Sequence, residues 1–193
     1  IYPLGLTGAP RQNTYGEPVH RLNTLLPWIS HIKRIGCNAI YIGPLFESVG
    51  HGYETTDYKK LDSRLGMNED LTNFVSECHK QGLRVILDGG FNHTGRDFFA
   101  FQDIKKNREN SPYKDWYCNV NFWGNNSFND GFSYENWGGY DLLAKLNQKT
   151  MIQGFQVKST DNGVYMMPVL DGKTLEEVVK QNKELKYHSM HLD

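Results

Sequence analysis

The sequence lacks the features that mark membrane-spanning and nucleic-acid-binding proteins. Its 21 Lys and Arg residues nearly balance its 22 Asp and Glu residues, for a net charge of −1. Charge therefore gives no reason to expect a nucleic acid or a membrane surface as a partner. The longest apolar runs fall far below the roughly 20 residues that a membrane-spanning helix needs.

Cysteine is also scarce. The three cysteines, Cys37, Cys78 and Cys118, are an odd number and lack the spacing of a metal site. Cys37 and Cys78 stand among apolar residues, so we expect both to be buried thiols. Because unpaired thiols favour a reducing compartment, we expect a cytoplasmic protein.

The length of the chain limits its fold. With 193 residues, 38% of them hydrophobic, the chain suits one globular domain with a sizeable core. A complete barrel of eight βα units typically takes about 250 residues. The chain is too short for such a barrel, even before its longest insertion is subtracted.

Apolar runs and helical periodicity alternate over the first half of the chain. Short apolar runs predict strands over 1–6, 38–45 and 83–88, the last of them buried. Leu, Ile and Phe recur at helical spacing over 22–35 and 69–81, which predicts two amphipathic helices. This alternation indicates right-handed crossovers on a parallel sheet.

Local signals set the ends of the two helices. Pro27 must lie in the first turn of the first helix, where a missing N–H is tolerated. Gly36 ends that helix and Gly82 ends the second. Asn68 is the expected N-cap of the second helix, and acidic residues follow it in the first turn.

The second half of the chain breaks this rhythm. Residues 94–147 are rich in Asn, Gly and Ser and hold 13 of the 25 Phe, Tyr and Trp residues, as is typical of a functional insertion. Further on, 154–158 and 164–170 flank a turn signal and predict a β-hairpin, after which Thr174 is expected to cap a helix. The predicted regions are 1–93, 94–147 and 148–193.

Polar residues follow the predicted strand over 83–88. Asp88, Asn92 and His93 come at the carboxyl end of the strand over 83–88. In α/β proteins the loops at the carboxyl ends of parallel strands build the active site. An Asp, an Asn and a His within six positions there indicate sugar or metal chemistry.

These segments closely resemble the α-amylase superfamily of glycoside hydrolases, over about residues 1–147. The resemblance rests on the D-x-x-x-N-H pattern of Asp88, Asn92 and His93, and on His51-Gly52-Tyr53 after the preceding strand. It implies that Asp88 supports the strand end, that Asn92 contributes to a calcium site and that His93 hydrogen-bonds a glucose unit. A neutral imidazole can donate to a sugar hydroxyl, and an amide oxygen suits calcium.

The resemblance also implies that Tyr53 stacks on the same sugar and that His51 binds its hydroxyls. Residues 94–147 would be the inserted domain B, which walls one side of the cleft. Taken alone, each residue has a plainer interpretation: Asp88 as a turn cap, Asn92 as a turn former, His51 as a loop histidine and Tyr53 as a partly buried anchor. The joint pattern favours sugar contact for His51, Tyr53 and His93.

The catalytic carboxylates of the family have no counterpart in the sequence. A retaining glycosidase needs two carboxylates about 5–5.5 Å apart. The family carries its nucleophile in a G-x-R-x-D motif and a Glu acid/base after the next strand, and neither motif occurs here. Asp171, in Val169-Leu170-Asp171, is the nearest stand-in for the nucleophile, although Asp171-Gly172 is more typical of a turn. Glu47 and Glu54 have no catalytic role in the family.

The sequence therefore predicts an α/β fold. It is a partial TIM (β/α)8-type barrel with the first three βα units, an aromatic-rich domain B and a tail with a hairpin and a helix. The predicted function is an α-glucan-acting glycoside hydrolase, truncated and with little or no activity alone. The alternatives are a non-catalytic module that binds α-linked glucan or maltooligosaccharide, and a functionless truncation product. No cofactor is required, calcium is possible, and an uncovered sheet edge predicts a homo-oligomer or capping by the tail.

Overall fold

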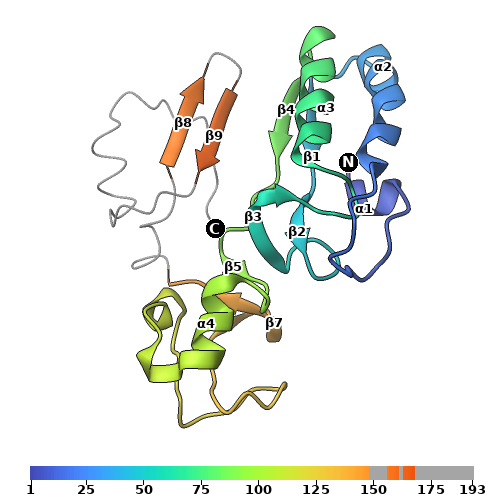
Figure 1. Cartoon of the computed structure of the whole chain (residues 1–193). Helices are drawn as coiled ribbons and strands as arrows, with labels where there is room; N and C mark the ends of the chain where they lie inside the picture. Colours follow the sequence, from blue (N-terminus) through green and yellow to red (C-terminus); the bar gives the residue numbers. More distant parts are fainter. Residues whose placement is uncertain (148–155, 161–162, 168–193) are drawn as a thin grey trace.

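The computed structural model describes residues 1–147, 156–160 and 163–167 (Figure 1). No helix in these ranges is long and apolar enough to cross a membrane. In chain order the elements are α1 (Pro3–Leu6), η1 (Arg21–Leu25), α2 (Leu26–Arg34), β1 (Ala39–Ile42), β2 (Phe46–Ser48), β3 (Thr55–Leu61), α3 (Asn68–Lys80), β4 (Arg84–Leu87), β5 (His93–Thr94), α4 (Phe99–Asn107), η2 (Arg108–Asn110), η3 (Lys114–Trp116), β6 (Asn136–Trp137), β7 (Tyr140–Lys145), β8 (Gln156–Thr160) and β9 (Gly163–Met167).

A parallel strand pair with helices on one side forms the first part of the fold. β1 pairs with β4 in parallel, with Ile40 opposite Val85 and Ile42 opposite Leu87, as the crossover pattern predicts. α3 lies between these strands in sequence and packs against β4, and α2 packs beside α3 (Figure 1). The predicted βαβ arrangement of 38–45 and 83–88 is confirmed.

The first predicted strand is wrong. Residues 3–6 form the short helix α1, because Pro3 stands in its first turn, where its fixed φ favours a helix start. Only Ile1 lies along β1: its amino group donates to the Tyr41 carbonyl at 2.7 Å, and the Gly43 N–H donates to the Ile1 carbonyl at 2.7 Å. These two bonds have the pattern of a parallel neighbouring strand.

The helix ends follow the predicted signals with two differences. Pro27 lies in the first turn of α2 and Gly36 follows its end at φ +89°, but the turn before α2 is the 3₁₀ segment η1 rather than α-helix. Met67, not Asn68, is the N-cap of α3. The Asn68 side chain instead contacts the end of β3, because Asn68 Oδ1 accepts from the Leu61 N–H at 2.8 Å.

One face of the strand pair is open. Along β1, Ile40 and Ile42 are buried whereas Tyr41 is 52% exposed, and its partner Ile86 on β4 is also 52% exposed. The prediction of a buried strand over 83–88 is therefore only half right, because successive side chains point to opposite faces and one face has no cover among the described residues.

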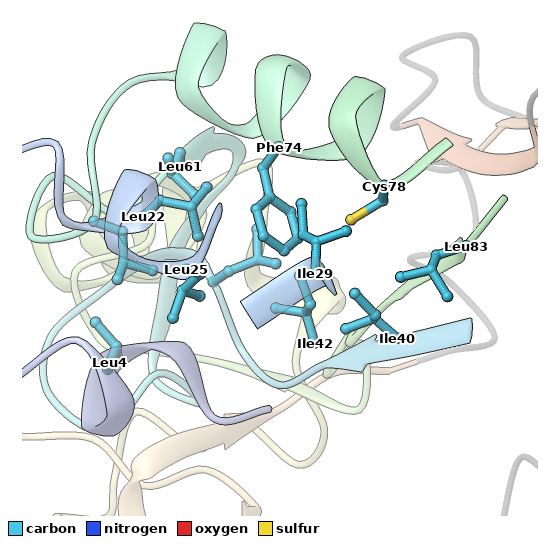
Figure 2. Packing of buried hydrophobic residues seen from close by; sticks show 12 residues of the cluster. Leu4, Leu22, Leu25, Ile29, Ile40, Ile42, Leu61, Phe74, Cys78 and Leu83 are labelled. Atoms are coloured by element: carbon cyan, nitrogen blue, oxygen red, sulfur yellow. The ribbon is translucent and has the colours of Figure 1, made fainter. Parts of the chain in front are cut away.

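The core lies on the helix side of these strands. Figure 2 shows Phe74 and Cys78 of α3 and Ile29 of α2 pointing toward Ile40 and Ile42 of β1. Cys78 is buried as predicted, but Cys37 is exposed, because it lies in the turn after α2 rather than in β1. Each fully buried Leu, Ile or Phe stabilises the fold by about 1.5–3 kcal/mol.

The segment 94–147 has its own hydrophobic cluster. β7 pairs with β5 on one side and β6 on the other, and α4 packs with this small sheet. Its buried rings contact each other edge to face or tilted, with Phe101 4.9 Å from Tyr134 and 5.4 Å from Tyr117. The aromatic residues of the insertion thus give it a core of its own.

In the tail, β8 and β9 pair antiparallel with Thr160 opposite Gly163, which confirms the predicted hairpin. The predicted helix after Thr174 and the candidate Asp171 lie outside the described residues.

The sequence did not predict the antiparallel hairpin that β2 and β3 form in the segment that follows β1 and precedes α3. β2 and β3 pair with two irregularities in register, and the loop over 49–54 joins them. That loop carries His51 and Tyr53. The fold therefore presents both candidate residues from a hairpin tip rather than directly from a strand end.

A buried ion pair fixes this loop. Arg64 and Asp62 are 5% and 0% exposed, and the guanidinium donates to both oxygens of the Asp62 carboxylate, at 2.8 and 2.7 Å. The same guanidinium donates to the Gly50 carbonyl at 2.7 Å and to the Ser48 hydroxyl at 2.9 Å. Another bond reaches the Pro10 carbonyl at 2.9 Å.

We expect Arg64→Met to destabilise the fold by about 3–5 kcal/mol, because it leaves the buried Asp62 carboxylate without its partner. The matched control is Lys80→Met, which removes the exposed pair with Glu77 and should cost about 0–1 kcal/mol. Urea unfolding measures both. Equal losses in the two variants would contradict the assignment of the Arg64 pair as a structural support.

Candidate functional site

Asp88 extends the pairing of the parallel strands by one residue. Its N–H donates to the Ile42 carbonyl at 2.9 Å, so the backbone at Asp88 is still fixed by the sheet. The carboxylate therefore stands at the carboxyl end of β4, where the sequence places it. The support role of Asp88 stays a prediction.

Tyr53 reaches from the β2–β3 loop to this carboxylate. Its hydroxyl donates to Asp88 Oδ2 at 2.9 Å, while the residue as a whole is 41% exposed. Burial and the hydrogen bond to Asp88 raise the pKa of Tyr53 to about 12, so the phenol keeps its proton near neutral pH. Burial and Asp88 raise the pKa of Tyr41 in the same way. The site thus holds an exposed ring with a fixed orientation.

His93 is held against the same loop. Its Nε2 lies 3.0 Å from the Tyr53 carbonyl, and since a carbonyl can only accept, Nε2 carries the proton. Burial lowers the pKa of His93, although the Tyr53 carbonyl and the nearby Glu54 act in the opposite direction. The ring is therefore neutral at pH 7, with Nδ1 as an acceptor. Asn92 Nδ2 lies 3.5 Å from Nδ1 and can donate to it, so a sugar hydroxyl would have to share this acceptor, whereas the sequence suggested the imidazole as the donor.

His51 uses both ring nitrogens within its own loop. Its Nδ1 accepts from the Tyr53 N–H at 3.2 Å, so Nε2 carries the proton and contacts Glu54 Oε1 at 3.2 Å. The Glu54 side chain is buried and also accepts from the Gly52 N–H at 3.3 Å. These contacts shape the loop. Sugar binding by His51 stays a prediction, because a hydroxyl would have to share Nε2 with Glu54.

Two further residues belong to the site, although no pattern in the sequence points to them. The Tyr58 hydroxyl on β3 lies 2.7 Å from the Gly90 carbonyl and 2.8 Å from the His93 carbonyl, and so fixes the loop after β4. The Trp137 ring on β6 lies 5.8 Å from the His93 ring, tilted by 33°, and the Trp137 residue is 52% exposed. Trp137 brings an aromatic surface from the insertion to the site.

Asn92 links the site to the insertion. Its carbonyl accepts from the Leu146 N–H at 2.9 Å, next to the pairing of His93 with Lys145. Within the described ranges, no three His, Cys, Asp or Glu side chains come together as a group that could hold a metal ion. The described residues thus offer Asn92 no group of carboxylate ligands that would complete a calcium site. Calcium binding at Asn92 stays a prediction.

The other carboxylates near the site have structural contacts. Glu47 is buried and accepts from Asn13 Nδ2 at 2.8 Å and from the Ser63 N–H at 3.0 Å. Together with the contacts of Glu54, these bonds engage both side chains in holding loops. Neither carboxylate is therefore free to serve as one of the two catalytic carboxylates of a glycosidase.

Solved structures with a similar fold define the class of protein. Ttha1563 from Thermus thermophilus has a TM-score of 0.62 and 39% identity, with 74% of this chain and 30% of that chain covered. The debranching enzyme of Nostoc punctiforme has a TM-score of 0.60 and 34% identity, with 65% and 26% covered. The similarity defines the class by its fold, an α/β chain like part of these two solved structures.

The chain belongs to the alpha-amylase catalytic-domain family, whose model matches residues 12–151. It is 42% identical over 97 residues to a cyclomaltodextrinase of Bacillus sp., and this match covers 50% of the chain and 17% of that relative. An oligo-1,6-glucosidase of Heyndrickxia coagulans is 31% identical over 140 residues, covering 72% and 23%. The chain thus spans about a sixth to a quarter of these relatives.

The lowered pKa of His93 predicts a pH dependence of stability. Above about pH 6.5 the imidazole is neutral in both the folded and the unfolded chain, and its contribution to stability is complete. As the pH falls below that value, the unfolded chain binds the proton more readily, so this contribution is lost. The free energy of unfolding of the parent relative to His93→Gln should therefore be smaller at pH 5.5 than at pH 7.5, by urea unfolding. An equal difference at both pH values would refute a neutral, buried His93.

Proposed function

We propose that this chain binds an α-linked glucan, with one glucose unit against the Tyr53 ring and beside His93. The observation that carries this proposal is the double attachment of Tyr53. Its hydroxyl is fixed by Asp88 and its carbonyl by His93, while 41% of the residue remains exposed. A preoriented ring loses little freedom when it packs on the apolar face of a sugar.

The relatives support a glucan as the ligand. Besides the cyclomaltodextrinase, they include amylopullulanases of Thermoanaerobacterium, 38% and 36% identical over 129 residues. A cyclic maltosyl-maltose hydrolase of Arthrobacter globiformis, solved in complex with maltose, has a TM-score of 0.60 and 29% identity. Membership in the family thus favours α-linked glucose chains over other sugars for this site.

Hydrolysis by this chain alone should be very slow or absent. The chemistry of a retaining glycosidase needs a nucleophile and an acid/base as a carboxylate pair. Among the described residues, Asp88 accepts from Tyr53, and Glu47 and Glu54 are buried in loop contacts. Asp171 stays the residue to test as a nucleophile. The proposed function is therefore glucan binding by a hydrolase-family chain.

Calorimetric titration with maltotriose tests the binding. We expect a dissociation constant in the millimolar range, about −4 kcal/mol, and a weakening of about tenfold in Tyr53→Ala. The matched control is Trp28→Ala, which removes a 42% exposed aromatic on α2 and should leave the affinity unchanged. An absence of binding by the parent chain would overturn the proposal.

The same sample tests hydrolysis. Turnover of a chromogenic maltooligosaccharide above about 1 per second would contradict the expected lack of activity. Loss of that rate in Asp171→Asn would then identify the nucleophile.

Calcium at Asn92 is a separate proposal, which rests on the amide oxygen and on the family pattern. Binding to the folded chain would stabilise it by about 2.7 kcal/mol at a free calcium concentration of 100 times the dissociation constant. Thermal unfolding in calcium and in EGTA should then differ for the parent and not for Asn92→Ala. Identical midpoints for the parent in both buffers would exclude calcium from this site.

Self-association and a cytoplasmic location also stay proposals. Ile86 on β4 is half exposed, and no described strand pairs with β4 other than β1, so a second copy could cover this edge. A monomeric mass by light scattering would argue against it. The free cysteines favour a reducing compartment, which cell fractionation would check.

A further inference from the structure

Strand β4 has an open edge on the side away from β1. The N–H groups of Arg84 and Asp88 donate to carbonyls on the β1 side at 3.0 and 2.9 Å. Because successive peptide groups of a strand point to opposite sides, those of Val85 and Leu87 point away from β1. No described strand pairs with β4 on that side. Such an edge is a template for pairing with a strand of another chain.

The side chains of this edge are complementary to a copy of the same edge. From Arg84 to Asp88 the order is a cation, three apolar residues and an anion. In an antiparallel pair of two such strands around Ile86, each Arg84 lies opposite an Asp88, and Ile86 lies opposite Ile86. Opposite charges and apolar residues that face each other stabilise antiparallel strands, whereas a parallel alignment would place like charges side by side. The pattern therefore favours two copies in antiparallel alignment.

The backbone geometry agrees with this alignment. Around Ile86, Val85 lies opposite Leu87 of the partner subunit, and both of these residues carry the peptide groups that point outward. Each such pair can exchange both of its N–H···O bonds. Ile86 then occupies a position between hydrogen-bonded pairs, where opposite side chains come closer. Since Ile86 is 52% exposed, the contact with its copy would remove apolar surface from water.

We propose that two copies of this chain pair along β4, antiparallel around Ile86, in a symmetric dimer. This inference rests on the self-association proposed above and names its strand, register and charges. It also adds a residue to the candidate site, because Arg84 of the partner subunit would lie opposite Asp88, the carboxylate that accepts from Tyr53. Since β4 is short, the interface is small and the dimer is weak.

Cross-linking through a new cysteine tests the register. In a Cys37→Ser background, which removes the exposed native thiol, Ile86→Cys should form a disulfide-linked dimer with copper phenanthroline as oxidant. The reason is that residues paired in this way have Cβ atoms about 4.5–5.5 Å apart, close to the span of a disulfide. The matched control is Tyr41→Cys, because Tyr41 is also 52% exposed beside Ile86 but lies on β1. Three strand spacings, about 14 Å, would separate it from its copy, so it should not cross-link.

Sedimentation equilibrium of the full chain tests the charge pairs. Arg84→Glu places like charges opposite each other in both halves of the interface, so the dissociation constant of the dimer should rise by at least about tenfold. Arg84→Lys keeps the charge and should keep most of the affinity. The matched control is Arg34→Glu, which makes the same change of charge at an exposed position of α2 and should leave the dimer unchanged.

The outcomes separate this inference from the proposals on which it builds. A dimer that Ile86→Cys does not link, that Tyr41→Cys links equally well, or that Arg84→Glu does not weaken would overturn the β4 pairing and leave self-association standing. A monomer at every concentration measured, as expected if the tail of the chain covers this edge, would overturn both. The titration with maltotriose tests glucan binding separately, so neither result decides it.

Discussion

The position of the candidate site depends on the buried ion pair between Asp62 and Arg64. Removing a guanidinium and a carboxylate from water costs several kcal/mol per ion, and only close pairing and full hydrogen bonding offset this cost. Arg64 meets that condition, because its remaining donors reach the carbonyls of Pro10 and Gly50 and the hydroxyl of Ser48. The pair therefore joins the chain before α2, the strand β2 and the loop that carries Tyr53.

A chain of contacts leads from this pair to the insertion. The Gly50 carbonyl fixes the start of the loop, and Glu54 fixes its middle through His51 and Gly52. Tyr53 then contacts Asp88 through its hydroxyl and His93 through its carbonyl. Since His93 begins β5, which pairs with β7, a displacement of the loop would also disturb the small sheet of the insertion.

The predictable parts of the fold are those with local signals. The periodicity of 69–81, the pairing of 38–45 with 83–88 and the tail hairpin agree with the structure. Pro27 and Gly36 mark helix ends through their own backbone preferences, which need no knowledge of distant residues. These residues lie within a few positions of the helix end that they determine, so the local sequence is enough to predict it.

The parts that escaped prediction depend on distant contacts or on conflicting local signals. Residues 1–6 are an apolar run, but Pro3 favours a helix start there instead of a strand. The sequence of β3 is mostly polar and charged, because most of its side chains are at least partly exposed, so it lacks the apolar pattern of a buried strand. Asp62 and Arg64 look like surface charges in the sequence, since nothing local shows the carbonyls that satisfy them. Trp137 lies 44 positions after His93, so only the pairing of β5 and β6 with β7 brings the two rings together.

The candidate site lies where two separately packed clusters meet. Tyr53 and Asp88 come from the side of the parallel strands, whose core is built around Phe74, whereas His93 and Trp137 come from the sheet of the insertion. The two sides are joined by the hydrogen bond of His93 to Tyr53 and by that of Leu146 to Asn92. A glucan that contacts both sides would add links between the clusters and so stabilise their relative position. Binding affinity should thus report on the packing of both parts, even though the carboxylates of Asp88, Glu47 and Glu54 near the site are engaged in structural contacts.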